Sequence, residues 1–131
     1  TIIPPQIHYV SKRILENSDW IKVGAHVLFV QECAPNLPPE YPTGIVFFEN
    51  VYHGKERFSM SVEFKDTVIV AVTYYFSAKQ ADLLPIIGYT AVKGRATAIK
   101  GQWTYILNES NRRTVIVGDK KKIVVVQTLD E

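Results

Sequence analysis

Cysteine is nearly absent from the sequence, and so are long apolar runs. Cys33 is the single cysteine among 131 residues, so the chain cannot form an internal disulfide or a cysteine-rich zinc site. No uninterrupted apolar stretch reaches the ~20 residues of a membrane-spanning helix. No basic segment followed by an apolar one marks a secretory signal at the start. The sequence therefore predicts a cytoplasmic protein without membrane insertion.

Reactive side chains are also sparse. The histidines, His8, His26 and His53, do not have the paired spacing of metal ligands, and there is no Asp-x-Asp pattern. A nucleophilic pair would need Cys33 within hydrogen-bond distance of an imidazole, which no spacing indicates. No glycine-rich loop opens a helix that would hold phosphate. We therefore expect a protein that is not an enzyme, with no catalytic residue, metal site or cofactor.

Composition places the chain among folded globular domains. It is 47% hydrophobic and 21% charged, far from the signature of disorder, and its length fits a single domain. The net charge of +2 is unevenly distributed, because residues 1–77 carry six Lys or Arg against eight Asp or Glu, whereas residues 78–131 carry nine against five. The basic second half predicts either a surface for an anionic partner or well-solvated turns.

Two apolar patterns separated by a polar break predict two strands and a turn. Over 57–64, apolar and polar residues alternate, which is typical of a strand with one wet face. Past Lys65 and Asp66, the run 68–76 is apolar at nearly every residue, which favours a strand covered on both faces or facing a partner. Further strands are expected within 20–31, with a bend at Gly24, and over 44–51, 89–99, 103–107, 114–117 and 122–128.

The short connections between these segments favour antiparallel hairpins. We predict a mainly β fold for residues 1–131, a single antiparallel barrel or a two-layer sandwich of about seven or eight strands. Residues 1–18 form a helical or extended arm, and the spacing of Ile7, Val10 and Ile14 favours a short helix over 6–16. A second helical turn is expected over 78–84, and four prolines make 33–43 a loop.

The proline-rich loop contains a short recognition pattern. Pro38, Pro39 and Tyr41 form Pro-Pro-x-Tyr, which resembles the ligands of WW domains and the late-budding motifs of some viral matrix proteins. The resemblance implies an exposed polyproline segment that binds a protein partner; the alternative is a purely structural loop. It also suggests a viral or other assembly-forming protein of matrix type, whose basic half meets nucleic acid or an anionic membrane.

A second resemblance concerns the strands. The segments 21–29, 43–47 and 58–66 resemble the opening, second and returning strands of small SH3-like or Tudor-like barrels. Such barrels bind peptides through aromatic cages, and the available rings are equally compatible with ordinary core packing: Trp20, Phe47, Tyr52 and Phe64. A barrel enclosing a small apolar ligand is a further alternative.

Basic residues gather at predicted turns and strand ends, with Trp103 between them. Cations interleaved with aromatic rings are typical of single-stranded nucleic acid binding, although basic turns also protect strand edges and promote solubility. The leading prediction is a non-enzymatic interaction domain that contacts a protein through its proline-rich loop or an anionic partner through its basic turns. A homo-oligomer is also expected. The residues proposed for the anionic partner are Lys93, Arg95, Trp103, Arg112, Arg113, Lys120, Lys121 and Lys122.

Overall fold

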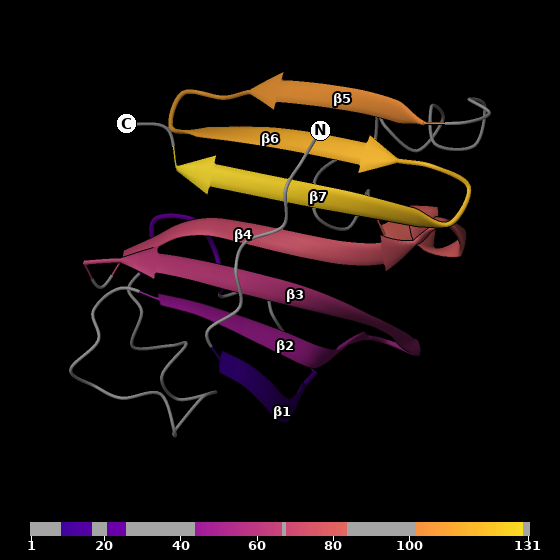
Figure 1. The fold of residues 1–131 in the computed structure, drawn as a ribbon, viewed down its shortest axis with the longest axis horizontal. Helices are drawn as coiled ribbons and strands as arrows, with labels where there is room; N and C mark the ends of the chain where they lie inside the picture. The colour runs from indigo at the N-terminus through magenta and orange to yellow at the C-terminus, as the bar shows by residue number, and fades with distance from the viewer. Residues whose placement is uncertain (1–8, 17–20, 26–43, 67, 84–101, 130–131) are drawn as a thin grey trace.

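The computed structural model describes residues 9–16, 21–25, 44–66, 68–83 and 102–129, which form one seven-stranded sheet. Figure 1 shows its strands stacked in the order β1-β2-β3-β4-β7-β6-β5. β1 is parallel to β2, and every other pair is antiparallel. The mainly β fold is therefore confirmed. The elements are β1 (Tyr9–Leu15), β2 (Gly44–His53), β3 (Glu56–Lys65), β4 (Val68–Ser77), the 3-10 helix η1 (Ala78–Leu83), β5 (Trp103–Asn108), β6 (Arg112–Gly118) and β7 (Lys122–Leu129).

The turns expected from the sequence join these strands. Gly54 and Lys55 connect β2 to β3, and His53 pairs with Glu56. Gly54 has a φ of 61°, which glycine adopts without steric penalty at the first position of a two-residue hairpin loop. The break at Lys65 and Asp66 separates β3 from β4, and η1 forms where a helical turn was expected. The predicted β-rich segments 26–31 and 89–99 lie outside the described residues.

The predicted N-terminal helix is wrong, because Tyr9–Leu15 is the strand β1. Its backbone pairs in parallel with β2, from Tyr9 opposite Val46 to Leu15 opposite Val51. The side chains expected to form the buried helical face, Val10 and Ile14, are exposed, whereas Leu15 is buried. Val10 and Ile14 are β-branched and favour a strand once a neighbouring edge supplies hydrogen bonds.

The pairing of β4 with β7 joins two antiparallel meanders, β2 to β4, to which β1 is added in parallel, and β5 to β7. It runs without a register shift from Ala71 opposite Thr128 to Ser77 opposite Lys122. Every residue of β4 from Ile69 to Phe76 is buried or half-buried. The apolar run in the sequence therefore corresponds to a central strand covered on both faces, as expected.

One face of the sheet, the core face, carries the hydrophobic core. Three of its rings are in mutual contact at the ends of β3 and β4: Phe58 lies 5.0 Å from Phe76, and Tyr74 lies 5.8 Å from Phe76, between ring centroids. Such pairs add stability beyond the buried area. The remaining buried hydrophobic residues of this cluster come from β1 to β7 and the 21–25 segment: Leu15, Ile21, Val46, Phe48, Val51, Met60, Val62, Phe64, Ile69, Val72, Trp103, Ile116, Ile123 and Val125.

The opposite face, called the outer face, has small polar residues at its centre. Ser61 and Thr73 are paired on β3 and β4, are 1% and 0% exposed, and their hydroxyls have no hydrogen-bond partner. Phe47 on β2 and Tyr75 on β4 meet edge to face at 5.8 Å. Because β3 lies between these two strands and carries only serine beside them, the rings can meet across it.

Among the described residues, the exposed large hydrophobic side chains lie on the outermost strands. They are Val10 and Ile14 on β1 and Ile106 on β5. No helix in the described part of the chain is long and apolar enough to cross a bilayer.

Trp103 packs across the backbone of Gly118, its neighbour in the β5–β6 ladder. A Cβ added at Gly118 would overlap the indole ring. Gly44 faces Phe64 in the same way on β2 and β3, but there an added Cβ would approach Cζ of the ring at 3.2 Å. Glycine is thus required at position 118 and only favoured at position 44.

We predict that Gly118→Ala lowers the free energy of unfolding by about 1–3 kcal/mol, the usual cost of overpacking a buried site. Gly44→Ala is the matched control and stays within about 1 kcal/mol of the wild type, because alanine regains strand stability that glycine lacks. Urea unfolding followed by tryptophan fluorescence measures both. Equal stability of the two variants would contradict the role assigned to the indole ring.

Candidate functional site

The basic residues expected from the sequence separate into two groups at opposite ends of β6. Lys120 and Lys121 lie in the β6–β7 connection and Lys122 begins β7, and all three side chains are exposed. Arg112 and Arg113 begin β6, about 20 Å away at the rise of an extended strand. The two groups therefore do not share one contact surface.

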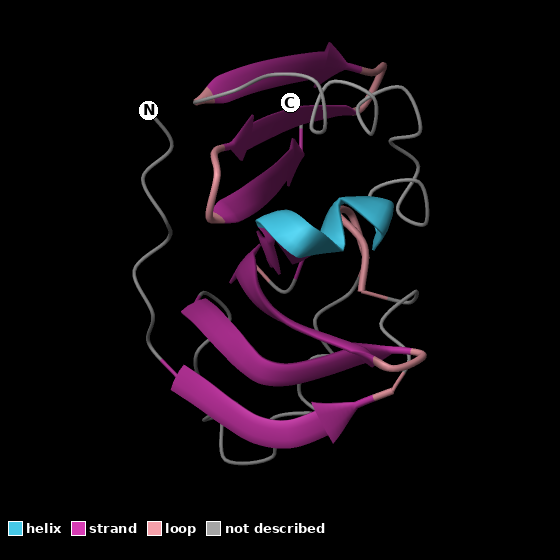
Figure 2. Ribbon diagram, turned by 90° about the vertical axis from the view of Figure 1, so that its right-hand side faces the viewer, coloured by secondary structure: helices cyan, strands magenta, loops and turns pink. Residues whose placement is uncertain are grey.

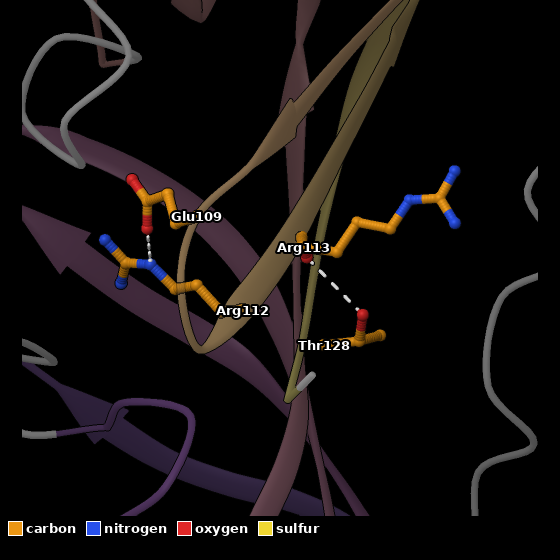
Figure 3. A network of polar contacts seen from close by, with 4 residues as sticks. All are labelled: Glu109, Arg112, Arg113 and Thr128. Carbon is orange, nitrogen blue, oxygen red and sulfur yellow. Dashed lines mark hydrogen bonds and ion pairs between the residues drawn. The ribbon is translucent and has the colours of Figure 1, made fainter. Parts of the chain in front are cut away.

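Arg112 and Arg113 also diverge from each other (Figure 3). Arg112 is half-buried and its Nε is paired with the Glu109 carboxylate. The exposed side chain of Arg113 points to the other side of the strand, while its backbone carbonyl accepts a 3.4 Å hydrogen bond from the Thr128 hydroxyl. Of this pair, Arg113 presents its charge to solvent without an ion pair to any described residue.

The tryptophan grouped with these cations belongs to the core face. Trp103 is 6% exposed and covers Gly118. Its ring therefore packs inside the molecule rather than against a surface ligand. Of the rings considered for an aromatic cage, Phe64 is fully buried, and Phe47 and Tyr52 are half-buried on the outer face.

Several sequence-predicted residues lie outside the described part of the chain: Pro38, Pro39, Tyr41, Lys93, Arg95, Trp20, Cys33, His8 and His26. His53 is exposed at the end of β2. Within the described residues, no group of His, Cys, Asp or Glu is arranged to hold a metal ion. The segment 21–25, part of the proposed opening strand of a small barrel, forms a turn at Gly24.

The helix η1 connects two turns that are far apart in sequence (Figure 2). Its first residue, Ala78, donates a 3.0 Å backbone hydrogen bond to the Lys121 carbonyl. The Gln80 amide donates to the Arg57 carbonyl at 2.7 Å and to Glu56 Oε2 at 3.1 Å. The side-chain Oε1 of Gln80 accepts the Ser77 backbone N–H at 2.9 Å, as the side chain at the third helical position does in a capping box. The β2–β3 hairpin and the β6–β7 turn are thereby held together.

This arrangement gathers cations at one end of the sheet, called the basic end. Among the side chains that the structure describes, the accompanying carboxylates are Glu56 and Asp119, which accept hydrogen bonds from Gln80 and from the β6–β7 turn, and Glu16, which lies near Tyr52 and Gly54. None of the cations is in a salt bridge with a described residue. The basic end consists of Lys55, Arg57, Lys79, Lys120, Lys121 and Lys122, all with exposed side chains.

Asp119 fixes the shape of the lysine turn. Its Oδ1 accepts backbone hydrogen bonds from Lys121 at 2.7 Å and Lys122 at 2.9 Å, and its own N–H donates to the Lys122 carbonyl at 2.9 Å. The two backbone bonds, helped by the charges of Lys122 and Lys121, lower the pKa of this carboxyl below its ordinary 3.8. The carboxylate thus orders the turn and leaves the lysine side chains directed to solvent.

A surface hollow lies beside the basic end, where β1 and β2 finish. Its volume is about 440 Å³, and it is lined by Ile14, Glu16, Tyr52 and Gly54. It opens at the margin of the sheet rather than inside it. It therefore differs from the enclosed cavity that an apolar ligand-binding barrel would need.

No protein-family model, curated protein or solved structure matches this chain. The sequence pointed to Lys120, Lys121 and Lys122 as a site, but it did not show that Lys55, Arg57 and Lys79 lie beside them. Their positions next to predicted strand ends were a partial signal. Only the pairing of β4 with β7 and the contacts of η1 complete the group.

The lowered pKa of Asp119 predicts a pH-dependent contribution to stability. Since the folded pKa lies below the unfolded value, this contribution is present above pH 3.8 and is lost as the pH falls through the folded pKa. Asp119→Asn removes it, so at neutral pH the variant melts at a lower temperature than the wild type, and this difference shrinks in acid. Thermal unfolding measures the difference, and NMR titration of the Lys121 and Lys122 amides locates the pKa. An ordinary pKa would contradict this assignment.

Removing the Gln80 side chain tests the connection between the two turns. Gln80→Ala loses the hydrogen bonds to Arg57, Glu56 and Ser77. We expect about 1 kcal/mol less stability, the net worth of exposed hydrogen bonds. Lys79→Ala, one residue away and exposed, should change stability by less than about 0.5 kcal/mol. Chemical denaturation compares the two, and equal effects would remove the bridging role.

Proposed function

We propose that this protein is a non-enzymatic interaction domain that binds an anionic partner through its basic end. The observation that carries the proposal is the convergence of six exposed cations from three segments, where two of the accompanying carboxylates, Glu56 and Asp119, are engaged in hydrogen bonds. A local excess of cations raises the concentration of an anionic ligand near the surface and speeds its association. The binding energy comes largely from neutralised charge and released counterions, so it falls with salt.

The rigidity of the basic end supports a binding role over simple solvation. The Asp119 carboxylate orders the lysine turn, and Gln80 and Ala78 tie it to the β2–β3 hairpin. The cations therefore extend from backbone held in one arrangement, which reduces the entropy lost when a ligand binds. Binding of a protein through Pro38, Pro39 and Tyr41, homo-oligomer formation and a matrix-type role stay predictions of the sequence.

The proposal predicts that the affinity for a polyanion depends on the position of the lysines and not on net charge alone. The variant Lys120→Ser/Lys121→Ser/Lys122→Ser should elute from a heparin column at clearly lower salt than the wild type. The matched control, Lys12→Ser/Lys22→Ser/Lys65→Ser, loses the same charge from exposed positions outside the basic end. It should elute close to the wild type. An equal loss in both variants would mean that net charge alone decides retention and would overturn the proposal.

A further inference from the structure

Two tyrosines lie on the outer face next to the cations of the basic end. Tyr52 on β2 is directly opposite Arg57 on β3, and Tyr75 on β4 is directly opposite Ser59, two residues further along β3. Paired residues share a face, and so do residues two apart on a strand. Tyr52, Arg57 and Tyr75 therefore all lie on the outer face. Both tyrosine rings are half-buried, so part of each is accessible.

Further along the outer face, a second cation lies close to Tyr52, Arg57 and Tyr75. Lys122 on β7 is paired with Ser77 on β4, and Ser77 shares a face with Tyr75. β4 is the one strand between β3 and β7, so Arg57 and Lys122 are about 10 Å apart at the spacing of neighbouring strands. Tyr75 lies one step inward from this line, about 7 Å along β4. Rings and cations thus alternate within a strip of the outer face.

The surroundings of Tyr75 hold its ring while leaving it accessible. Phe47 contacts it edge to face at 5.8 Å across β3. On β3, Ser59 is too small to cover the ring, and its hydroxyl donates to the Glu49 carbonyl at 3.3 Å. A ring supported from one side and flanked by a small residue offers a surface on which a flat ligand group can stack.

We propose that the outer face at the basic end binds single-stranded nucleic acid. Arg57, Lys122 and the lysine turn contact phosphates, and bases stack on Tyr52 and Tyr75. This is the combination of cations and aromatic rings by which single strands are held without dependence on sequence. The inference rests on the proposed function and names its partner.

The position of the rings favours a single strand over a bilayer or a duplex. Tyr75 lies within the sheet face, two residues before the end of β4, so a flat membrane touching the lysine turn would not reach it. The bases of a duplex are already stacked on each other and cannot cover a tyrosine without unpairing. Glu63, also on the outer face and six residues beyond Arg57 on β3, is about 20 Å away. Its negative charge limits the phosphate path on that side, and Glu16 beside Tyr52 and Glu49, which is paired with Lys12, limit it toward β1.

Fluorescence anisotropy with a labelled oligothymidylate of about 12 nucleotides, within the site sizes of single-strand binders, tests the inference. Tyr52→Leu and Tyr75→Leu should each weaken binding about 5- to 150-fold, equivalent to ~1–3 kcal/mol per stacked base. Tyr52→Phe and Tyr75→Phe keep the rings and should bind like the wild type. Lys122→Ser should lower the slope of log affinity against log salt by about 0.7, as expected for one lost contact to a single strand.

The competing ligands are tested in parallel with a duplex of the same length and with vesicles of phosphatidylserine and phosphatidylcholine. Preference for the single strand, together with loss of binding in the leucine variants only, supports the inference. Binding that is equally tight in the leucine and phenylalanine variants, or tighter to duplex or vesicles, overturns it. If heparin retention still depends on Lys120, Lys121 and Lys122 in that case, the proposed anionic interaction stands and only the named partner fails.

Thermal unfolding of each tyrosine variant separates lost binding from lost folding. Tyr75 contacts Phe47, so Tyr75→Leu removes some packing. Tyr52 lies near the hairpin turn and beside the surface hollow, where leucine disturbs less. Tyr52→Leu is therefore the deciding variant, and full binding by a folded Tyr52→Leu protein would by itself contradict stacking at this position.

Discussion

The antiparallel pairing of β4 with β7 is the contact on which the rest of the fold depends. It joins a meander built from the first half of the sequence to one built from the last, and it covers the edge of the most apolar strand that β3 leaves open. The alignment places Phe76 beside Ile123 and Tyr74 beside Val125 on the core face. It also places Ser77 beside Lys122, which fixes the distance between the β6–β7 turn and the start of β3. The register between β4 and β7 therefore determines both the packing of the core and the arrangement of the basic end.

Local sequence determined most of the strands correctly because alternation and turn chemistry act over a few residues. The patterns over 57–64 and 68–76, separated at Lys65 and Asp66, correspond to β3 and β4. The prediction for the N-terminal segment was wrong because its structure depends on a contact with a distant part of the chain. Its apolar spacing fits a helix, but a neighbouring strand far along the chain supplies the partner that makes it β1. The strand order could not be predicted, because local sequence patterns carry no information on which distant strands pair, such as β4 with β7.

The candidate site also combines residues that the sequence indicates with residues that only the fold brings together. A run of three lysines is visible in any reading of the sequence, and so is the isolated Trp103, yet the fold buries the tryptophan and leaves the lysines exposed. The residues that extend the site, Arg57 and Tyr75, look like ordinary members of alternating strands. Their shared face follows from register alone. Sequence reasoning could propose a charged cluster, whereas the aromatic strip beside it required the sheet.

The position of β7 has a consequence for how the chain reaches its native state. β7 follows every other described strand in sequence but lies between β4 and β6 in space. During synthesis, one edge of β4 therefore stays unpaired until β7 is made. Until then, β5 and β6 are not paired with the meander that contains β4. An apolar strand with an unsatisfied flank is a template for wrong pairing between molecules. Pairing with β7 closes this flank of β4 and so removes an unpaired strand edge on which incomplete chains aggregate.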